Sequence, residues 1–449
     1  MLTRFAPDNA CPQPLSAAEF SSLLRPLGPF GHRPLLGLAV SGGADSLALA
    51  LLAQHWAQDQ DGGAEAFVVD HGLRADSRSE AESTAQRLSE RGIATRILPL
   101  SDLKPGPGIS DRARGARYRA LAEACGRAGI VHLLLGHHAA DQAETLIMRS
   151  LRGSGDSGLA GMAAVAETGG IRLLRPLLTV PPGRLRATLR AAGLDWAEDP
   201  TNADTRFTRA RLRGLRADGA GNGPATRALT ETARLFGLRR AESDQAIAGF
   251  LADYAVIRPE GFMRITADGS WPAAALAQAL RMITGADYPA GPAAIARIAA
   301  DPSGSIGRGL VLGGARLLPA GRLGTGFLVC REAAAMAPPV PALAGAVWDG
   351  RFRMPAGESD QPGEMIAPLG TDAARFRRVS DLPAVVLRTL ACFRNRAGDL
   401  LAVPALSWAA DGESGGRRLL FAPAVPAAGA PFFPAPQTIS CSSAKKMTG

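Results

Sequence analysis

The chain has 449 residues, of which 46% are hydrophobic, and a formal net charge of +9. This length and apolar content are enough for two or three domains with buried cores. The positive charge favours an anionic partner such as nucleic acid. However, nearly all of it is arginine, and a compositional bias toward Ala, Gly, Arg and Pro would give the same balance.

Cysteine usage and hydropathy exclude several classes of protein. The five cysteines are scattered without a C-x-x-C pair, which argues against a disulfide framework and against a zinc or iron–sulfur site. No apolar run reaches membrane-spanning length, and the N-terminus lacks the pattern of a signal peptide. We therefore expect a cytosolic protein with no membrane association.

The first strong signal follows a short N-terminal stretch, residues 1–33, in which Ser16–Glu19 forms a capping box for a short helix. Leu35–Val40 predicts a buried strand, and Leu47–Trp56 predicts a helix that packs on a sheet. The intervening loop, Ser41–Ser46, thus joins a strand to a helix N-terminus, where unpaired N–H groups and the helix dipole favour a phosphate. The alternative is an ordinary Gly-Ser turn with an acidic helix cap.

The loop is not a Walker loop, because the chain has only three lysines and none is near it. An aspartate in place of the lysine suits a nucleotide whose charge is shared with Mg²⁺. We therefore predict phosphate binding by the whole loop, with the aspartate as the metal ligand. The residues are Ser41, Gly42, Gly43, Ala44, Asp45 and Ser46.

Strands and helices then alternate along the chain. Further strands are predicted at 66–69, 93–98 and 130–135, and further helices at 77–91, 110–127 and 139–151, with Ser77 and Ser110 as helix caps. This alternation predicts an α/β fold with a doubly wound parallel sheet. Ligands of such sheets lie outside the carboxyl ends of the strands, which we call the rim.

Charged pairs are predicted near this rim. Arg114 and Arg117 share a helix face and either contact phosphate or are solvated. Asp141 and Glu144 also share a face, and they either complement the helix dipole or bind a cationic substrate beside His137, a possible proton acceptor.

Two later segments each have a purely structural and a functional interpretation. Residues 152–162, which begin at Arg152, are a glycine-rich linker or a mobile segment that closes on a polyanion. Residues 206–216 contain five arginines and no acid, and they form either a solvated face or an RNA backbone contact.

The domain boundaries are inferred from changes in amino-acid composition that follow residue 216. We predict a nucleotide-binding domain at 34–216, a middle helical or α+β domain at 225–333, and a small β-rich domain at 346–430. Linkers precede the last two, and residues 431–449 form a tail.

The motif S-G-G-A-D-S resembles the signature of the PP-loop ATP pyrophosphatases, which cleave ATP between its α- and β-phosphates. Within that superfamily, the ordered motifs resemble those of the tRNA(Ile)-lysidine synthase family over residues 35–213. They are SGGADS, VDHGLR, RGARY, GHHAADQAET, RGSGDSGLAGM, RPLL and WAEDPTNAD. Two positions depart from the family pattern, because Ala140 replaces an acid and Ala210 replaces an asparagine.

This resemblance implies an ATP-dependent ligase that joins L-lysine to C2 of cytidine 34 in the CAU anticodon of tRNA(Ile), through a C2-O-adenylate. AMP and pyrophosphate are released, and codon specificity changes from AUG to AUA. The implied lysine-binding residues are Asp141, Glu144 and Arg209, and the implied catalytic residues are Asp45, His137, Asp141 and Glu144. The implied tRNA contacts are Arg114, Arg117, Arg152, Arg206, Arg211 and Arg213.

ATP, Mg²⁺, lysine and tRNA are then the expected ligands, with no obligate protein partner. The sequence fits two other functions less well. A tRNA thiolase usually carries catalytic or cluster-binding cysteines, but only Cys125 lies in the predicted catalytic domain. A nucleotide-gated RNA-binding protein without catalysis would not need the paired acids.

Overall fold

The computed structural model describes residues 12–72, 76–100, 106, 109–168, 170–197, 211–212, 218, 221–286, 288, 290–355, 360–412 and 417–427. The chain divides into two compact units. Unit 1 comprises residues 1–241 with 432–449, and unit 2 comprises residues 242–431. The boundary falls inside one long helix, α9 (Pro224–Tyr254). The finer domain boundaries expected from the sequence stay a prediction.

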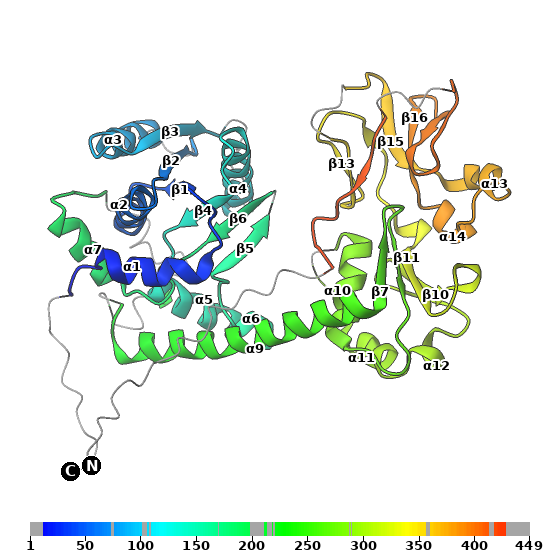
Figure 1. The fold of residues 1–449 in the computed structure, drawn as a ribbon, viewed down its shortest axis with the longest axis horizontal. Coiled ribbons are helices and arrows are strands. Elements are labelled where there is room, and N and C mark those ends of the chain that lie inside the picture. The colour runs from blue at the N-terminus through cyan, green and yellow to red at the C-terminus, as the bar shows by residue number, and fades with distance from the viewer. Residues whose placement is uncertain are drawn as a thin grey trace, which may run out of the picture. The chain divides into compact units, whose positions relative to one another are not determined.

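Unit 1 is built on a six-stranded sheet with the strand order β3-β2-β1-β4-β6-β5 (Figure 1). All neighbouring strands pair in parallel except β5 with β6, which are antiparallel. The strands are β1 (Leu35–Val40), β2 (Gly63–Asp70), β3 (Ala94–Pro99), β4 (His132–Leu135), β5 (Val165–Thr168) and β6 (Ile171–Leu174). The carboxyl ends of five parallel strands therefore lie along one rim.

Helices cover both faces of this sheet (Figure 1). Leu38 and Val40 of β1 belong to a core shared with helices on one face, while Ala39 between them belongs to a core shared with a helix on the other. This alternation is the two-residue period of a strand buried on both faces. The first face carries α1 (Ala17–Leu24), α2 (Ala44–Gln58), α3 (Ser77–Ser89) and α7 (Pro182–Ala191), and the second carries α4 (Ile109–Arg127).

The doubly wound α/β fold is therefore confirmed. Strand β1 has the predicted bounds, as does α5 (Ala139–Leu151). Helix α4 begins at Ile109, one residue before the predicted cap Ser110. Strands β5 and β6 were not predicted, and β6 adds a position to the rim.

Unit 2 contains the smaller α+β part expected after the catalytic domain. Its sheets are all antiparallel, with the strand orders β7-β8-β11-β10-β9, β12-β15-β16-β17-β18 and β13-β14-β19. The strands are β7 (Ala255–Arg258), β8 (Phe262–Ile265), β9 (Leu310–Leu312), β10 (Ala315–Pro319), β11 (Phe327–Arg331), β12 (Val340–Pro341), β13 (Val347–Trp348), β14 (Phe352–Arg353), β15 (Glu364–Pro368), β16 (Ala391–Asn395), β17 (Leu400–Val403), β18 (Trp408–Ala409) and β19 (Leu420–Phe421). The helices are α10 (Ala273–Thr284), α11 (Pro292–Ala300), α12 (Pro302–Ile306), α13 (Ala373–Phe376) and α14 (Ala384–Leu387).

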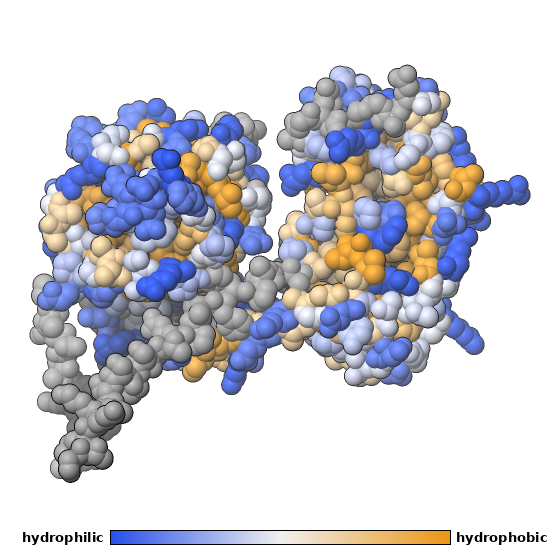
Figure 2. Space-filling model, in the orientation of Figure 1, coloured by the Kyte–Doolittle hydropathy of each residue, from blue (hydrophilic) through white to orange (hydrophobic). Residues whose placement is uncertain are grey.

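One expectation about the later chain needs correction. Part of the predicted second linker is strand β12, which pairs with β15. Of the apolar residues in the unit 1 part of α9, Ala233 is buried, while Leu229, Phe236 and Leu238 are half-buried. On the face shown in Figure 2, hydrophobic surface is interrupted by hydrophilic residues in each unit. None of the described helices combines the length and apolarity that a membrane span requires.

Candidate active site

The loop Ser41–Ser46 joins the carboxyl end of β1 to the first turn of α2. Gly42 has a φ of +82°, and a Cβ at this position would lie 2.5 Å from the Thr84 hydroxyl oxygen, so only glycine fits. Gly43 is the N-cap of α2 and provides no side-chain cap. The first N–H groups of α2 therefore have no capping side chain, which is the arrangement expected of an anion-binding helix N-terminus.

The two serines of the loop differ in environment. Ser46 is buried, and its hydroxyl donates to the Gly43 carbonyl oxygen at 3.0 Å and accepts from the Ser41 N–H at 3.1 Å. Ser41 is exposed, with its hydroxyl oxygen 3.2 Å from that of Ser46. Ser46 thus fixes the shape of the loop, whereas Ser41 is exposed to solvent.

Gly136 allows the end of β4 to approach this loop closely. A Cβ at Gly136 would lie 3.0 Å from the Cα and 3.1 Å from the backbone nitrogen of Ser46, and 3.2 Å from the carbonyl carbon of Asp45. These are backbone atoms at the start of α2, so they cannot rotate away as a side chain could. The glycine of the G-H-H motif is therefore required to place the histidines beside Ser41–Ser46, which we call the phosphate loop.

The side chain of His138 contacts the carboxylates of both Asp45 and Asp141. Its Nε2 lies 3.4 Å from Oδ2 of Asp45 and 3.6 Å from Oδ2 of Asp141. Its backbone N–H also donates to Oδ2 of Asp141 at 3.1 Å, because His138 is the N-cap of α5 and Asp141 is the third residue of that helix. Asp45 and Asp141, from different helices, are thus brought together.

The structure distinguishes the members of the predicted acidic pair. The Asp141 side chain keeps 13% exposure, whereas Glu144 is fully buried one helical turn further along α5. Asp141 is therefore the carboxylate open to a ligand. His138 was not predicted as a site residue, although an N-cap three residues before an acid is a recognisable helix-start pattern.

His137 lies at the carboxyl end of β4, and its Nδ1 is buried without a hydrogen-bond partner. Burial is the main cause that lowers the pKa of His137 to about 4, and the charges of Arg175, Arg114 and Arg117 lower it further, while Asp141 opposes them. The His137 imidazole is therefore neutral at pH 7.

The two predicted arginines of α4, Arg114 and Arg117, lie in the half of that helix that begins at the rim. Arg114 is exposed, and its guanidinium lies over the Tyr118 ring, 5.3 Å from the centroid. Arg117 is half-buried, and burial lowers the pKa of its guanidinium. Arg117 is therefore not the freely solvated side chain that one interpretation of the sequence expected.

The glycine-rich segment after α5 contains a short helix, α6 (Asp156–Leu159). Arg149 of α5 donates from Nη1 to the carbonyl oxygens of Gly158 at 2.8 Å and Gly161 at 2.7 Å. Gln142 exchanges two hydrogen bonds with the backbone of Met162, at 2.7 and 3.0 Å. These contacts tie the segment to α5, while Arg152 at the end of α5 remains exposed.

The predicted capping role of Ser77 is wrong. The N-cap of α3 is Asp76, and the Ser77 hydroxyl instead donates to Oδ1 of Asp70 at the end of β2. The Gly72 N–H also donates to Oδ1 of Asp70, at 3.1 Å. The Ser77 hydrogen bond is the main cause that holds the pKa of Asp70 below its usual range. Ser77 therefore anchors the loop after β2 to the rim.

Several predicted residues lie outside the described residues, namely Arg206, Arg209, Ala210 and Arg213. Arg211 is described and exposed. The chain that leads to this region does reach the phosphate loop, because the Ala197 N–H donates to the Gly42 carbonyl oxygen at 3.1 Å.

The residues at the loop fit a magnesium ion that is shared with a nucleotide. Oδ1 of Asp45 is buried and has no hydrogen-bond partner. Within the part of the chain that the structure describes, no group of three or more His, Cys, Asp or Glu is arranged to hold a metal. One carboxylate with phosphate oxygens is a usual magnesium environment, so Asp45 would need the nucleotide to complete it.

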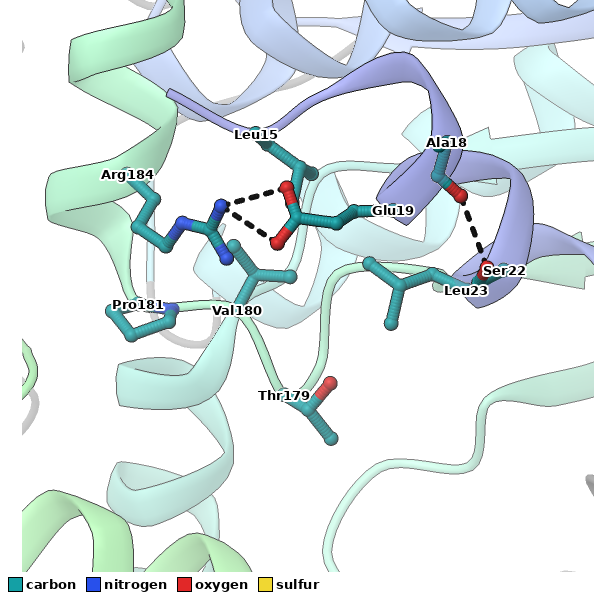
Figure 3. Close-up of a pocket in the computed structure, with 9 residues that line it drawn as sticks. All are labelled: Leu15, Ala18, Glu19, Ser22, Leu23, Thr179, Val180, Pro181 and Arg184. Atoms are coloured by element: carbon teal, nitrogen blue, oxygen red, sulfur yellow. Dashed lines mark hydrogen bonds and ion pairs between the residues drawn. The ribbon is translucent and has the colours of Figure 1, made fainter. Parts of the chain in front are cut away.

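A separate cavity of about 420 Å³ lies between α1, α7 and the loop at 179–181 (Figure 3). Arg184 and Glu19 form an ion pair at 2.9 Å on its wall. Glu19 also completes the predicted capping box with Ser16, which is confirmed. None of the predicted site residues lines this cavity.

The parallel sheet, the glycine loop after β1 and the uncapped start of α2 define a PP-loop protein. The PP-loop domain family matches residues 14–215. Curated relatives are more specific. The chain is 46% identical over 242 residues to the tRNA(Ile)-lysidine synthase of Bradyrhizobium sp. (strain BTAi1), a match that covers 54% of this chain and 65% of the relative. It is 35% identical to the tRNA(Ile)-lysidine synthase of Mesorhizobium japonicum, over 78% of this chain and 79% of the relative.

The chain therefore belongs to the tRNA(Ile)-lysidine synthase family. Its match to the Bradyrhizobium relative spans slightly less than two thirds of that protein's length. Among solved structures, the U34-tRNA thiolase NcsA from Methanococcus maripaludis is similar over 48% of this chain and 77% of that chain, with 17% identity and a TM-score of 0.41.

Proposed function

We propose that this protein is an ATP-dependent ligase that joins L-lysine to C2 of cytidine 34 in the CAU anticodon of tRNA(Ile). The observation that carries the proposal is the meeting of Asp45 and Asp141 at His138 Nε2, at 3.4 and 3.6 Å. Asp45 belongs to the loop suited to a triphosphate, and Asp141 to the helix suited to a cationic amine. The reaction needs these two ligands side by side.

In the first half-reaction, the cytidine C2 oxygen attacks the α-phosphorus of ATP, and the bond to the β-phosphate oxygen breaks to release pyrophosphate. The uncapped N–H groups at the start of α2 and the Ser41 hydroxyl would bind phosphate oxygens. Asp45 would hold Mg²⁺, which when bound offsets the charge on the triphosphate and the leaving pyrophosphate.

In the second half-reaction, the lysine ε-amine attacks C2, and the C2–O bond breaks so that AMP leaves with the oxygen. Asp141 would bind an ammonium group of lysine directly, and Glu144, which is buried one helical turn further along α5, is proposed as the second acid of the lysine site. Arg209, outside the described residues, is proposed for the lysine carboxylate.

The amine must lose a proton to attack. His137 is a proposed acceptor, because its neutral imidazole can accept a hydrogen bond from the amine. With a pKa of about 4, however, His137 is a weak base, so it would hold the proton only transiently.

The proposed tRNA contacts extend from the same rim. Exposed Arg114, Arg152 and Arg211 are suited to backbone phosphates, and half-buried Arg117 to a group that enters the site. Arg206 and Arg213 are proposed with them, outside the described residues. The positive formal charge of +9 agrees with an RNA ligand.

A thiolase activity has no support from the described cysteines. Cys125 is buried among the apolar residues of α4 and the sheet, and burial raises the pKa of its thiol to about 12. It is therefore a protonated core residue at neutral pH and not a nucleophile.

The test is mass spectrometry of nucleosides after the full chain is incubated with ATP, isotope-labelled lysine and a CAU tRNA(Ile) transcript. We expect labelled lysidine, and multiple-turnover pyrophosphate release that requires both lysine and the transcript. The matched control is the same transcript with adenosine at position 34, which has no C2 oxygen. Label-free nucleosides, or equal release with the control transcript, would reject the proposal.

A further inference from the structure

Arg175 is a buried cation at the rim, and neither half of the proposed reaction uses it. It follows β6 directly and is 8% exposed. Its Nη1 donates to the Ala163 carbonyl oxygen at 2.8 Å, and its side chain also forms a hydrogen bond with Tyr118. Its Nε, by contrast, is buried without a partner. Leaving a buried donor unsatisfied destabilises the fold, and more so when the donor belongs to a charged group.

A second unsatisfied atom belongs to the neighbouring strand. His137, whose Nδ1 is buried without a partner, follows β4, and β4 pairs in parallel with β6. Adjacent strands lie about 4.8 Å apart, so the residues that follow their carboxyl ends are neighbours. The charge of Arg175 is also one of the causes that lower the pKa of His137, in agreement with this strand pairing.

The surroundings of Arg175 are positive. Arg114 lies over Tyr118, the hydrogen-bond partner of Arg175, and Arg114 lowers the pKa of Arg175 after the larger effect of burial. Among the described residues, no carboxylate forms an ion pair with Arg175. A buried guanidinium without an acidic partner is costly to the fold, and an anionic ligand would offset that cost.

We propose that Arg175 anchors a binding site for a phosphoryl oxygen, with His137 beside it and Tyr118 holding the guanidinium in place. The planar guanidinium fork suits a phosphate better than a lysine would. The proposal rests on the proposed function, because the phosphate would belong either to ATP or to the RNA strand next to the target cytidine. Arg175 is thus a binding residue that positions one phosphate relative to the loop at Ser41–Ser46.

The test measures binding by the full chain, without turnover. The variants are Arg175→Met, which removes the charge, Arg175→Lys, which keeps it without the fork, and Tyr118→Phe. Arg172→Met is the matched control, because Arg172 is on the same strand but its guanidinium binds the carbonyl oxygens of Leu27 and Gly28 at 3.1 and 3.3 Å. The probes are α,β-methylene-ATP and an anticodon stem-loop RNA with a CAU anticodon.

We expect the Arg175→Met substitution to lower the affinity for one probe at least tenfold and Arg175→Lys to lower it less. The Arg172→Met control should leave the affinities for both probes unchanged. Weaker binding of the ATP analogue assigns the phosphate to the nucleotide. Weaker RNA binding, with the slope of log affinity against log salt reduced by about one, assigns it to the RNA.

Affinities of Arg175→Met within twofold of wild type for both probes would overturn the proposal. If Arg175→Met does not fold, the Arg175→Lys variant decides in the same way: a loss of at least threefold supports the site, and wild-type affinity for both probes refutes it. Because neither probe requires lysine transfer, absence of lysidine would reject the proposed function and leave this result standing.

Discussion

The contact between Gly136 and the start of α2 allows a sharp test of how the site is assembled. The Gly136→Ala substitution adds one methyl group that would lie 3.0–3.2 Å from three backbone atoms of Asp45 and Ser46. Since no side chain can rotate away, either β4 or the first turn of α2 must move by a few tenths of an ångström or more. The change therefore separates His137 and His138 from the phosphate loop without removing any of their functional groups.

The expected cost follows from overpacking. One extra methyl in a well-packed interior typically destabilises a protein by about 1–3 kcal/mol. A misplacement of about 1 Å in an active site can lower the rate about 100-fold. We therefore expect lysidine formation to fall about 10–100-fold, more than the loss of stability alone would cause, since a protein that is about 2 kcal/mol less stable is still mostly folded.

The assay compares turnover with local stability. Because the chain has two units and no single unfolding transition is assured, hydrogen exchange of the β1 and β4 peptides in urea reports on unit 1 better than a global signal does. The control is Gly126→Ala in α4, where a Cβ would meet no atom within 4 Å. That change should stabilise α4 by about 0.5–1 kcal/mol and leave turnover unchanged. If the Gly136→Ala variant turns over at the wild-type rate, the claim that Gly136 positions the histidines is refuted.

Three further substitutions test separate parts of the site. Asp45→Ala should abolish pyrophosphate release while tRNA affinity, measured by filter binding, stays within about twofold (about 0.4 kcal/mol); unchanged release would remove the magnesium assignment. Glu144→Gln should raise the KM for lysine more than the KM for ATP, and the reverse pattern in steady-state kinetics would reject the lysine assignment. Ser77→Ala removes the main cause of the lowered Asp70 pKa, so its loss of stability should be full above the ordinary carboxyl pKa of 3.8 and shrink as the pH falls below it. A stability difference in urea titrations that grows toward low pH would contradict that account.

The elements that could be predicted from the sequence are those whose pattern is local. Leu35–Val40 is a strand with the expected bounds because an apolar run followed by glycines has few alternatives. Helix α5 has the expected bounds because His138 and Asp141 form its helix-start contact within four residues. Even the grouping of Asp45 with Asp141 followed from one rule, that ligands of a parallel sheet gather at the carboxyl ends of its strands.

The features that the sequence did not predict depend on contacts between residues that are far apart in the sequence. Ser77 fits a helix cap by its position, but the Asp70 carboxylate competes for its hydroxyl, and this pairing exists only once β2 and α3 are packed. Strand β6 has only four residues and contains Arg172, so its pattern is weak. Without β6, nothing in the sequence places Arg175 on the rim, although the R-P-L-L motif that contains it is visible.

The departure at Ala140 can be explained by packing on the side of α5 that faces away from the phosphate loop. Ala140 is 5% exposed, and its Cβ would lie 3.3 Å from a Cβ built on Gly221, which itself has a φ of +65°. Pro182 of α7 lies against the same position of Gly221. Successive residues of a helix point about 100° apart, so the neighbour of Asp141 contacts this packed surface while Asp141 itself contacts His138. An acid at position 140 would have to be buried beside a proline ring and a backbone in the left-handed region, where an unpaired carboxylate is unfavourable. The alanine therefore matches the local packing, and the two carboxylates that meet at His138 do not depend on it.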